Sequence, residues 1–299
     1  MAQRQVEGPG SAVVHARLRE QVAELRLRDP DVRDNLPDAV HKMRVAIRRL
    51  RSALATFRPL FDEQVSEPLR EELKWIAGLL GEARDADVLR ERLGASIAEE
   101  PVELVLGPVS ARVEGELGNA CRDALARSAK AMKSERYLGL LDSLDTLVSD
   151  PPWTKAGHPA RTDLLGRFRH DWKRLRRLVA AADDASDPAK RDHLLHEVRK
   201  AAKRVRYSAE TLVPAYGRDA ERLAQAAERV QSVLGEHQDS AVAQDCLRRL
   251  GMQADLDGQN AFTYGRLHAQ ERVRADDSAA KFTKTWDKAS RKKLRRWLG

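Results

Sequence analysis

The sequence has 299 residues, of which 33% are charged and only 5% are aromatic. Lysine and arginine outnumber the acidic residues, which gives a formal net charge of +8 and a pI near 9.6. This excess favours polyanionic partners such as nucleic acid, polyphosphate or an anionic membrane surface. Helix-forming residues dominate, and no long alternating run of β-branched residues predicts a strand. The composition therefore indicates an all-helical protein with an anionic partner.

Several classes of protein are excluded by what the sequence lacks. The two cysteines, Cys121 and Cys246, form no disulfide framework or zinc motif and fit a reducing compartment. No run approaches the roughly 20 apolar residues of a membrane span, and residues 1–14 have no apolar core of signal-peptide length. No phosphate-binding loop, dinucleotide fingerprint or nucleophile elbow occurs. We therefore expect a cytoplasmic binding protein that is not an enzyme, with no catalytic residues and no cofactor.

The chain divides into two similar series of predicted helices. Residues 1–10 resemble a leader, and a helix from Ser11 should end at Asp29-Pro30. Asp38 is the expected cap of the next helix, and Pro68 the expected first turn of the third. Later helices are predicted at about 108–131, 134–147, 161–182, 189–213, 218–250 and 258–275, with a basic closing segment that we expect to be the last bundle helix. Residues 149–160, which hold three prolines, are the expected linker.

A basic amphipathic pattern occurs once in each series. If residues 41–54 are helical, at about 100° per residue, a cationic stripe lies beside an apolar one. The cationic stripe is His41, Arg44, Arg48 and Arg51, and the apolar stripe is Met43, Ile47, Leu50 and Leu54. The pattern returns 155 residues later, with His196, Arg199, Lys203 and Arg206 beside Val198, Ala202, Val205 and Ala209. Solvation alone would not place a histidine at the head of both stripes.

A second pair of motifs shows that the two series are copies. GEARDADV at 81–88 matches GEHQDSAV at 235–242, an offset of 154 residues. Two motif pairs at nearly one offset predict an internal duplication. We expect two antiparallel bundles of the four-helix type, residues 11–148 and 161–299, related by a pseudo-twofold axis with a central basic pore.

The chemistry of the stripes favours a phosphate-rich ligand. Cations that converge on one axis repel one another and lose solvation, and a polyanion resolves both problems. The planar fork of arginine donates paired hydrogen bonds to phosphate, and lysine adds a point charge. Off-stripe residues Lys42, Arg49, Lys200 and Arg204 either widen the site or face solvent, and Lys173 and Arg177 could add to it.

A metal site is the alternative interpretation of some of these residues. His193, His196 and Glu197 resemble a scrambled zincin motif, but their order is HxxHE, which matches neither known arrangement. The first copy has Asp38 where the second has His193. Asp85 and its counterpart Asp239 fit a structural pairing with arginine better than metal binding. We therefore predict no metal.

The quoted motifs resemble the CHAD family (conserved histidine α-helical domain) over about residues 11–297. The resemblance rests on HKMRVAIRRLRSALATF, LLGEARDADVL, HEVRKAAKRVRYSAE and VLGEHQDSAVA. It implies an all-helical fold, non-catalytic binding of long-chain inorganic polyphosphate in a basic pore, and association with polyphosphate granules. Some relatives carry an N-terminal triphosphatase domain, which we do not expect here.

The resemblance also assigns residues. The family's histidine falls on His41 and His196, and its basic positions fall on Arg44, Arg48, Arg49 and Arg51 and on Arg199, Lys200, Lys203, Arg204 and Arg206. Gln238 stands where the first copy has Arg84, so the two halves of the pore should be unequal.

Two rival functions remain at this point. The first is a nonspecific nucleic-acid-binding module, which the net charge would allow at low salt, although the stripes lack interleaved aromatics for base stacking. The second is a metal-dependent phosphoanhydride hydrolase. Oligomeric state and chain-length preference do not follow from the sequence.

Overall fold

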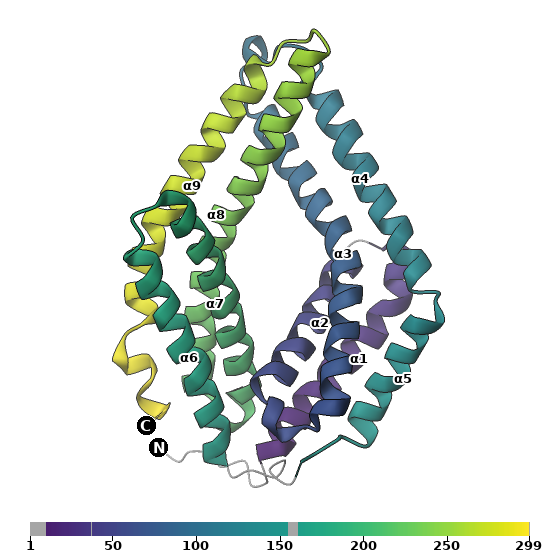
Figure 1. Ribbon diagram of the computed structural model, residues 1–299, viewed down its shortest axis with the longest axis vertical. Helices are drawn as coiled ribbons and strands as arrows, with labels where there is room; N and C mark the ends of the chain where they lie inside the picture. The colour runs from purple at the N-terminus through teal and green to yellow at the C-terminus, as the bar shows by residue number, and fades with distance from the viewer. Residues whose placement is uncertain (1–9, 37, 155–160, 299) are drawn as a thin grey trace. The chain divides into compact units, whose positions relative to one another are not determined.

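The computed structural model of the chain describes residues 10–36, 38–154 and 161–298. This part contains nine α-helices and no β-strand, which confirms the all-α prediction (Figure 1). None of the helices in it combines the length and the apolar composition that crossing a bilayer requires. The predicted leader, apart from Gly10, and residues 155–160 of the predicted linker lie outside the described residues.

The helices follow the same order in both halves of the chain. The first half has α1 (Gly10–Arg33), α2 (Ala39–Thr56), α3 (Glu63–Ala98), α4 (Val109–Ala131) and α5 (Glu135–Ser149). The second half has α6 (Arg161–Asp183), α7 (Pro188–Tyr216), α8 (Arg218–Leu256) and α9 (Phe262–Ala289). The two basic segments are therefore α2 and α7, the second helix of each half.

The predicted end of the first helix at Asp29-Pro30 was wrong, because α1 continues to Arg33. Asp29 accepts hydrogen bonds from Arg33 Nε at 2.8 Å and from the hydroxyl of Tyr137 at 2.6 Å. These side-chain contacts hold the turn that follows Pro30. The tendency of a helix to end before a proline is therefore outweighed here by the contact of Asp29 with Tyr137 on α5.

Two further proline boundaries were also wrong. Helix α3 begins five residues before Pro68, because the backbone carbonyl of Asp62 already accepts from Ser66 N at 2.9 Å. Helix α7 includes Pro214 and ends at Tyr216, and the next residue, Gly217, has a φ of 57°, in the left-handed region that glycine adopts without steric cost.

Capping residues explain two of the other helix starts. Ser134 Oγ accepts from Tyr137 N at 3.3 Å at the start of α5, and Asp187 Oδ2 accepts from Lys190 N at 2.8 Å at the start of α7. Asp38 occupies the predicted N-cap of α2, but its side chain makes no capping bond and its φ is 59°. Its carbonyl accepts from Lys42 N at 2.9 Å instead.

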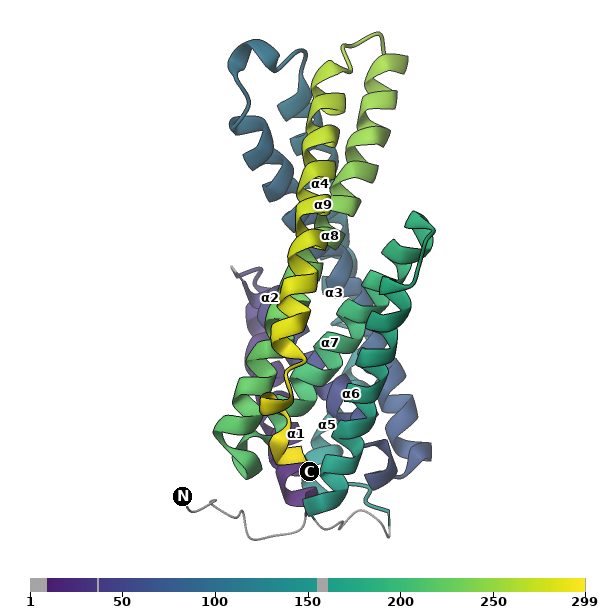
Figure 2. The same ribbon diagram turned by 90° about the vertical axis from the view of Figure 1, so that its left-hand side faces the viewer.

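The first of two compact units consists of Met1–Gly78, Ala129–Gln231 and Thr285–Gly299. It holds α1, α2, α5, α6 and α7 with the first parts of α3 and α8, so both halves of the chain contribute to it. Within it α1 packs on α2, α6 packs on α7, and α2 packs on α7. Figure 2 shows α6 and α7 side by side. The two basic helices thus belong to one unit.

The apolar stripes predicted on α2 and α7 form the core of this unit. The side chains of Met43, Ile47, Leu50 and Leu54 are fully buried, as are Val198, Ala202, Val205 and Ala209. Burying such a side chain contributes roughly 1.5–3 kcal/mol for the larger residues. The burial fixes the rotation of each helix about its axis, and with it the direction of the cationic stripe.

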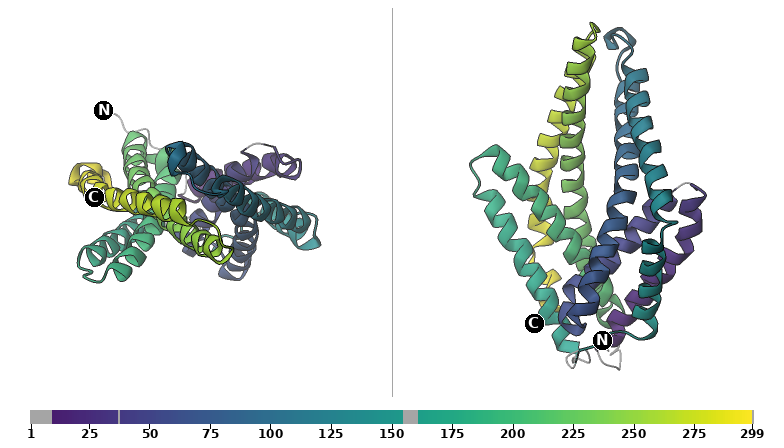
Figure 3. Two further views of the ribbon diagram at one scale, coloured as in Figure 1. Left: turned by 90° about the horizontal axis from the view of Figure 1, so that it is seen from above. Right: turned by 45° about the vertical axis from the view of Figure 1, so that its right-hand side comes forward.

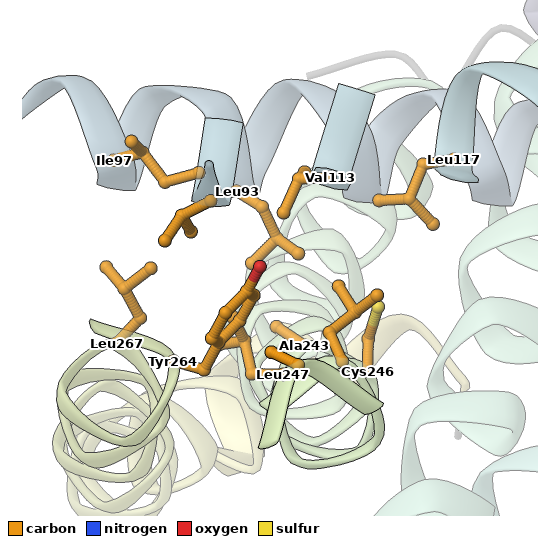
Figure 4. Close-up of a cluster of buried hydrophobic side chains, with 12 residues drawn as sticks. Leu93, Ile97, Val113, Leu117, Ala243, Cys246, Leu247, Tyr264 and Leu267 are labelled. Carbon is orange, nitrogen blue, oxygen red and sulfur yellow. The ribbon is translucent and has the colours of Figure 1, made fainter. Parts of the chain in front are cut away.

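The second compact unit consists of Leu79–Ser128 and Ser232–Lys284. It is built from the two helical pairs α3–α4 and α8–α9, which Figure 3 shows as long hairpins. Its core is a cluster of buried side chains drawn from all four helices (Figure 4). The members are Leu93, Ile97, Val109, Val113, Leu117, Ala243, Cys246, Leu247, Leu250, Ala254, Tyr264 and Leu267.

A buried ion network ties α3 to α9 in the second unit. The Glu271 side chain is only 1% exposed, and its carboxylate accepts from Arg92 Nη2 and from Arg274 Nη1, each at 2.7 Å. Arg92 Nη2 also contacts Glu236 at 2.6 Å. Although burial opposes the charged form, the hydrogen bonds to Glu236 and Glu271 raise the pKa of Arg92.

The basic end of the chain is packed, as expected, but it is not one continuous helix. Helix α9 ends at Ala289, and short 3₁₀ turns follow at Lys292–Leu294 and Arg296–Leu298. Trp286 stacks on Trp172 of α6 with ring centroids 5.6 Å apart, and Trp297 lies 5.9 Å from Phe168. Aromatic contacts to α6 therefore anchor this segment.

Replacing Glu271 by Ala should lower the free energy of unfolding by about 3–5 kcal/mol, because two guanidinium groups lose their buried counter-charge. The matched control is Glu99→Ala, which removes an exposed carboxylate 3.4 Å from Arg274 and should cost less than about 1 kcal/mol. Urea unfolding followed by circular dichroism measures both. Equal losses in the two variants would contradict a structural role for the network.

Candidate anion-binding site

The cationic stripe of α2 lies beside its buried apolar stripe. His41 is exposed, and Arg44, Arg48 and Arg51 are partly buried. On α7 the equivalent residues His196, Arg199, Lys203 and Arg206 are all partly buried. Both rows therefore lie at the edge of the core, where aliphatic stems pack and charged ends can still meet a ligand.

Hydroxyl groups join α2 to α7 directly. The Oγ1 atom of Thr56 lies 2.9 Å from the Oγ atom of Ser208, and both residues are buried. Because this contact and the packing of α2 on α7 lie in the first unit, segments 155 residues apart in sequence are held together there. The structure thus brings the two predicted basic helices side by side.

A buried carboxylate from α6 binds this hydroxyl pair. Asp171 is 4% exposed, and its Oδ2 accepts from Thr56 at 2.7 Å and from Ser208 at 3.2 Å. Its Oδ1 forms an ion pair with Arg204 Nε at 3.1 Å. Arg204 is therefore held as a structural partner of Asp171, although the sequence left open whether it faces ligand or solvent.

A second carboxylate, that of Glu210 on α7, forms ion pairs with three arginines from three helices. Its Oε2 accepts from Arg17 Nη2 at 2.7 Å and pairs with Arg49 Nε at 3.1 Å. Its Oε1 accepts from Arg206 Nε at 2.9 Å, and Arg206 Nη2 also contacts Glu228 at 2.9 Å. The carboxylate of Glu210 is thus shared by three arginines, of which Arg17 also pairs with Glu20 at 2.7 Å.

Two arginines of the stripes have no acidic partner. Neither Arg48 nor Arg199 forms an ion pair among the described residues, and the Nε atom of each is buried there without a hydrogen-bond acceptor. At Arg51, burial, followed by repulsion from Arg70, lowers the pKa of the guanidinium. A buried donor without an acceptor costs free energy, and an anionic ligand would supply acceptors for Arg48 and Arg199.

The remaining predicted site residues have exposed side chains. Lys200 is exposed and pairs with Glu197 at 2.7 Å, which lowers the pKa of that carboxyl group. Lys173 and Arg177 are exposed on α6, and neither has an ion-pair partner within the described ranges. Their part in ligand binding stays a prediction, as does that of Lys200.

Sequence reasoning missed the residues that organise the interface, although two of them left a signal. Asp171 occurs in the apolar register of α6, between Phe168 and Leu175, where a carboxylate requires a partner. Glu210 follows Arg206 by four residues on the cationic face of α7. Their distant partners carry no signal in a single sequence.

The structure offers no metal-ligand cluster in the part of the chain that it describes. No three His, Cys, Asp or Glu side chains gather there in a way that could hold a metal ion. Cys121 and Cys246 are free thiols in the second unit, and burial raises the pKa of both.

The chain matches the model of a known protein family. The family model described as the CHAD domain matches residues 16–248, which is well over half of the sequence. The chain therefore belongs to the CHAD domain family, as the motifs on α2, α3, α7 and α8 had led us to expect.

Two curated relatives share sequence with nearly the whole chain. The uncharacterized proteins MT2285 and Rv2226 of Mycobacterium tuberculosis are each 37% identical to it over 266 residues, or 88% of this chain. That match covers 50% of each relative, so the chain spans about half the length of these proteins.

Two solved structures share the fold. PptA from Streptomyces chartreusis superposes with a TM-score of 0.76 at 24% identity, covering 93% of this chain and 99% of that one. The CHAD domain from the plant Ricinus communis gives a TM-score of 0.70 at 24% identity, covering 95% of this chain and 93% of that one. These likenesses support the all-helical architecture.

Two arginines of the site should differ in what they contribute to stability. Arg204→Gln should lower the free energy of unfolding by about 2 kcal/mol, because the buried Asp171 loses a charged partner. Arg48→Gln should change it by less than about 0.5 kcal/mol or raise it, because Arg48 has no counter-charge to lose. Urea unfolding compares the two, and a larger loss for Arg48→Gln would refute the assignment.

Proposed function

We propose that the chain binds long-chain inorganic polyphosphate, without turnover, along the cationic stripes of α2 and α7. The observation that carries the proposal is the packing of α2 on α7 with guanidinium groups that lack counter-charge among the described residues, Arg48 and Arg199 foremost. In this proposal the stripes line the expected basic pore. Membership of the CHAD domain family supports it, because that resemblance implies polyphosphate as the ligand.

The spacing of the cations suits a linear anion better than a small one. Residues three or four positions apart on a helix are separated by roughly 4.5–6 Å along its axis. Arg44, Arg48 and Arg51 therefore form a row that one extended chain can contact at several points. Linked phosphates that occupy several subsites gain affinity over a single phosphate, because later contacts are intramolecular.

Binding without turnover is the second part of the proposal. Arginine and lysine, which make up most of each stripe, bind and orient phosphate groups, and the family resemblance implies binding without catalysis. We further propose that the protein works in the cytoplasm and that binding attaches it to polyphosphate granules. Incubating the pure protein with polyphosphate and Mg²⁺ tests turnover, and release of orthophosphate or chain shortening would refute this part.

One observation favours nucleic acid as a second candidate ligand. Helix α6 and the C-terminal turns expose further cations, including Arg169, Arg176, Lys292 and Lys293. Such a surface would bind a phosphate backbone nonspecifically at low salt. Competition separates the candidates: polyphosphate should displace single-stranded DNA at equal phosphate concentration, and displacement only in the opposite direction would favour nucleic acid.

The double variant Arg44→Glu/Arg48→Glu should abolish polyphosphate binding at physiological salt, because it replaces two cations of the row by anions. Isothermal titration calorimetry with polyphosphate measures affinity, and circular dichroism checks that helicity is retained. The matched control, Lys292→Glu/Lys293→Glu, makes the same change in net charge in the C-terminal 3₁₀ turn. It should weaken binding far less.

Two outcomes would contradict the proposal. Binding that survives in a folded Arg44→Glu/Arg48→Glu variant would exclude the α2 stripe as the site. Equal loss in both double variants would show that net charge, and not the stripe, determines affinity.

A further inference from the structure

The cationic face of α7 ends in a carboxylate. Glu210 lies seven residues after Lys203 and four after Arg206, so at about 100° per residue it shares their face of the helix. Its side chain is 18% exposed, similar to the 20% of Arg206. A negative charge in the proposed binding face opposes a polyanion, and its position there requires an explanation.

We infer that Glu210 is an internal competitor of the polyanion: it occupies arginines that the bound ligand would otherwise contact, and so lowers the affinity of the site. The inference rests on the proposed function. Its support is the contact set of Glu210, whose carboxylate reaches Arg17 of α1 at 2.7 Å, Arg49 of α2 at 3.1 Å and Arg206 of α7 at 2.9 Å. Among these, Arg49 and Arg206 are predicted ligand-binding residues.

Asp171 provides an internal comparison. It is 4% exposed, and two hydroxyl groups and one arginine use both of its oxygens. A phosphate chain could replace it only by entering the protein core, because Thr56 and Ser208 are buried as well. Glu210 is more exposed, and its partners Arg17, Arg49 and Arg206 can bind phosphate as readily as carboxylate. Phosphate can therefore displace the carboxylate of Glu210 from its arginine partners, but it cannot displace that of Asp171.

The internal duplication shows that the carboxylate is not required by the helix pattern. The position 155 residues before Glu210 is Ala55, on the same face of α2. Arg51, the counterpart of Arg206, thus has no carboxylate one turn later on its own helix. The cationic stripe of α2 is thus followed by an alanine, whereas the cationic stripe of α7 is followed by a carboxylate. Competition with the ligand should therefore lower affinity mainly where α7 carries Glu210.

The test compares Glu210→Gln with a control on the same helix. Glu197→Gln makes the same change in net charge from a side chain that is 21% exposed and pairs with Lys200 and Arg174. It frees one predicted ligand-binding residue, Lys200, whereas Glu210→Gln releases two, Arg49 and Arg206. Polyphosphate affinity is measured by calorimetry at several salt concentrations. Glu210→Gln should bind about three- to tenfold more tightly at low salt than Glu197→Gln, because a nearby charge acts more strongly than a remote one.

The salt dependence supplies a second readout. Each additional phosphate that a freed arginine neutralises should steepen the slope of log affinity against log salt by roughly 0.7–0.9. We expect a steeper slope for Glu210→Gln than for both the wild type and Glu197→Gln. A purely structural role would instead lower stability and leave affinity and slope unchanged or reduced.

A double variant covers the case in which Glu210→Gln fails to fold because arginines are left unpaired. Arg17→Gln/Glu210→Gln keeps the net charge of the wild type and still frees Arg49 and Arg206. It should bind more tightly than Arg17→Gln alone. If the wild type binds polyphosphate and neither Glu210 variant binds more tightly than its control, the inference fails while the proposed function stands. If the wild type does not bind, both fail.

Discussion

The packing of two cationic helices against each other is the constraint on which the first unit depends. Two like charges about 5 Å apart repel by roughly 3 kcal/mol at an effective dielectric constant near 20. Burial of the apolar stripes opposes this, because each large apolar side chain contributes about 1.5–3 kcal/mol. The core residues Met43, Ile47, Leu50 and Leu54 are fully buried, so apolar packing outweighs the repulsion and holds α2 against α7.

The two carboxylates at this interface divide the cations into two groups. Asp171 and Glu210 form ion pairs with Arg204, Arg49 and Arg206, which lets these charged groups lie near the core. Arg48 and Arg199 receive no such partner among the described residues. An interface built for stability alone would not retain buried Nε atoms without acceptors, because an unsatisfied buried donor costs free energy. A ligand that supplies the counter-charge would account for their presence.

The sequence predicted the buried and cationic faces of single helices and the meeting of the two basic helices, but it missed the contacts that pair individual charges across helices. Periodicity predicted the buried face of α2 and of α7 correctly, because a 3.6-residue repeat records burial directly. Periodicity did not show that Arg204 has an acidic partner whereas Arg48 has none among the described residues. The partner of Arg204 is Asp171 on α6, and the spacing of residues along α7 does not reveal a contact with another helix. The boundaries predicted from Pro30, Pro68 and Pro214 failed because a local proline preference does not decide where these helices begin or end. At Pro30 the deciding contact comes from Tyr137 on α5, outside the local segment.

The two longest helices, α3 and α8, occupy matching positions in the two halves of the chain. Helices α3 and α8 are 36 and 39 residues long, about 54 and 58 Å at 1.5 Å per residue, and each contributes to both compact units. The cluster in the second unit takes Leu93 and Val113 from the first half of the chain and Leu247 and Leu267 from the second. Neither half therefore contains a complete core for either unit. Both halves of the chain contribute to each unit, and in the first unit these contributions include α2 from one half and α7 from the other, packed together.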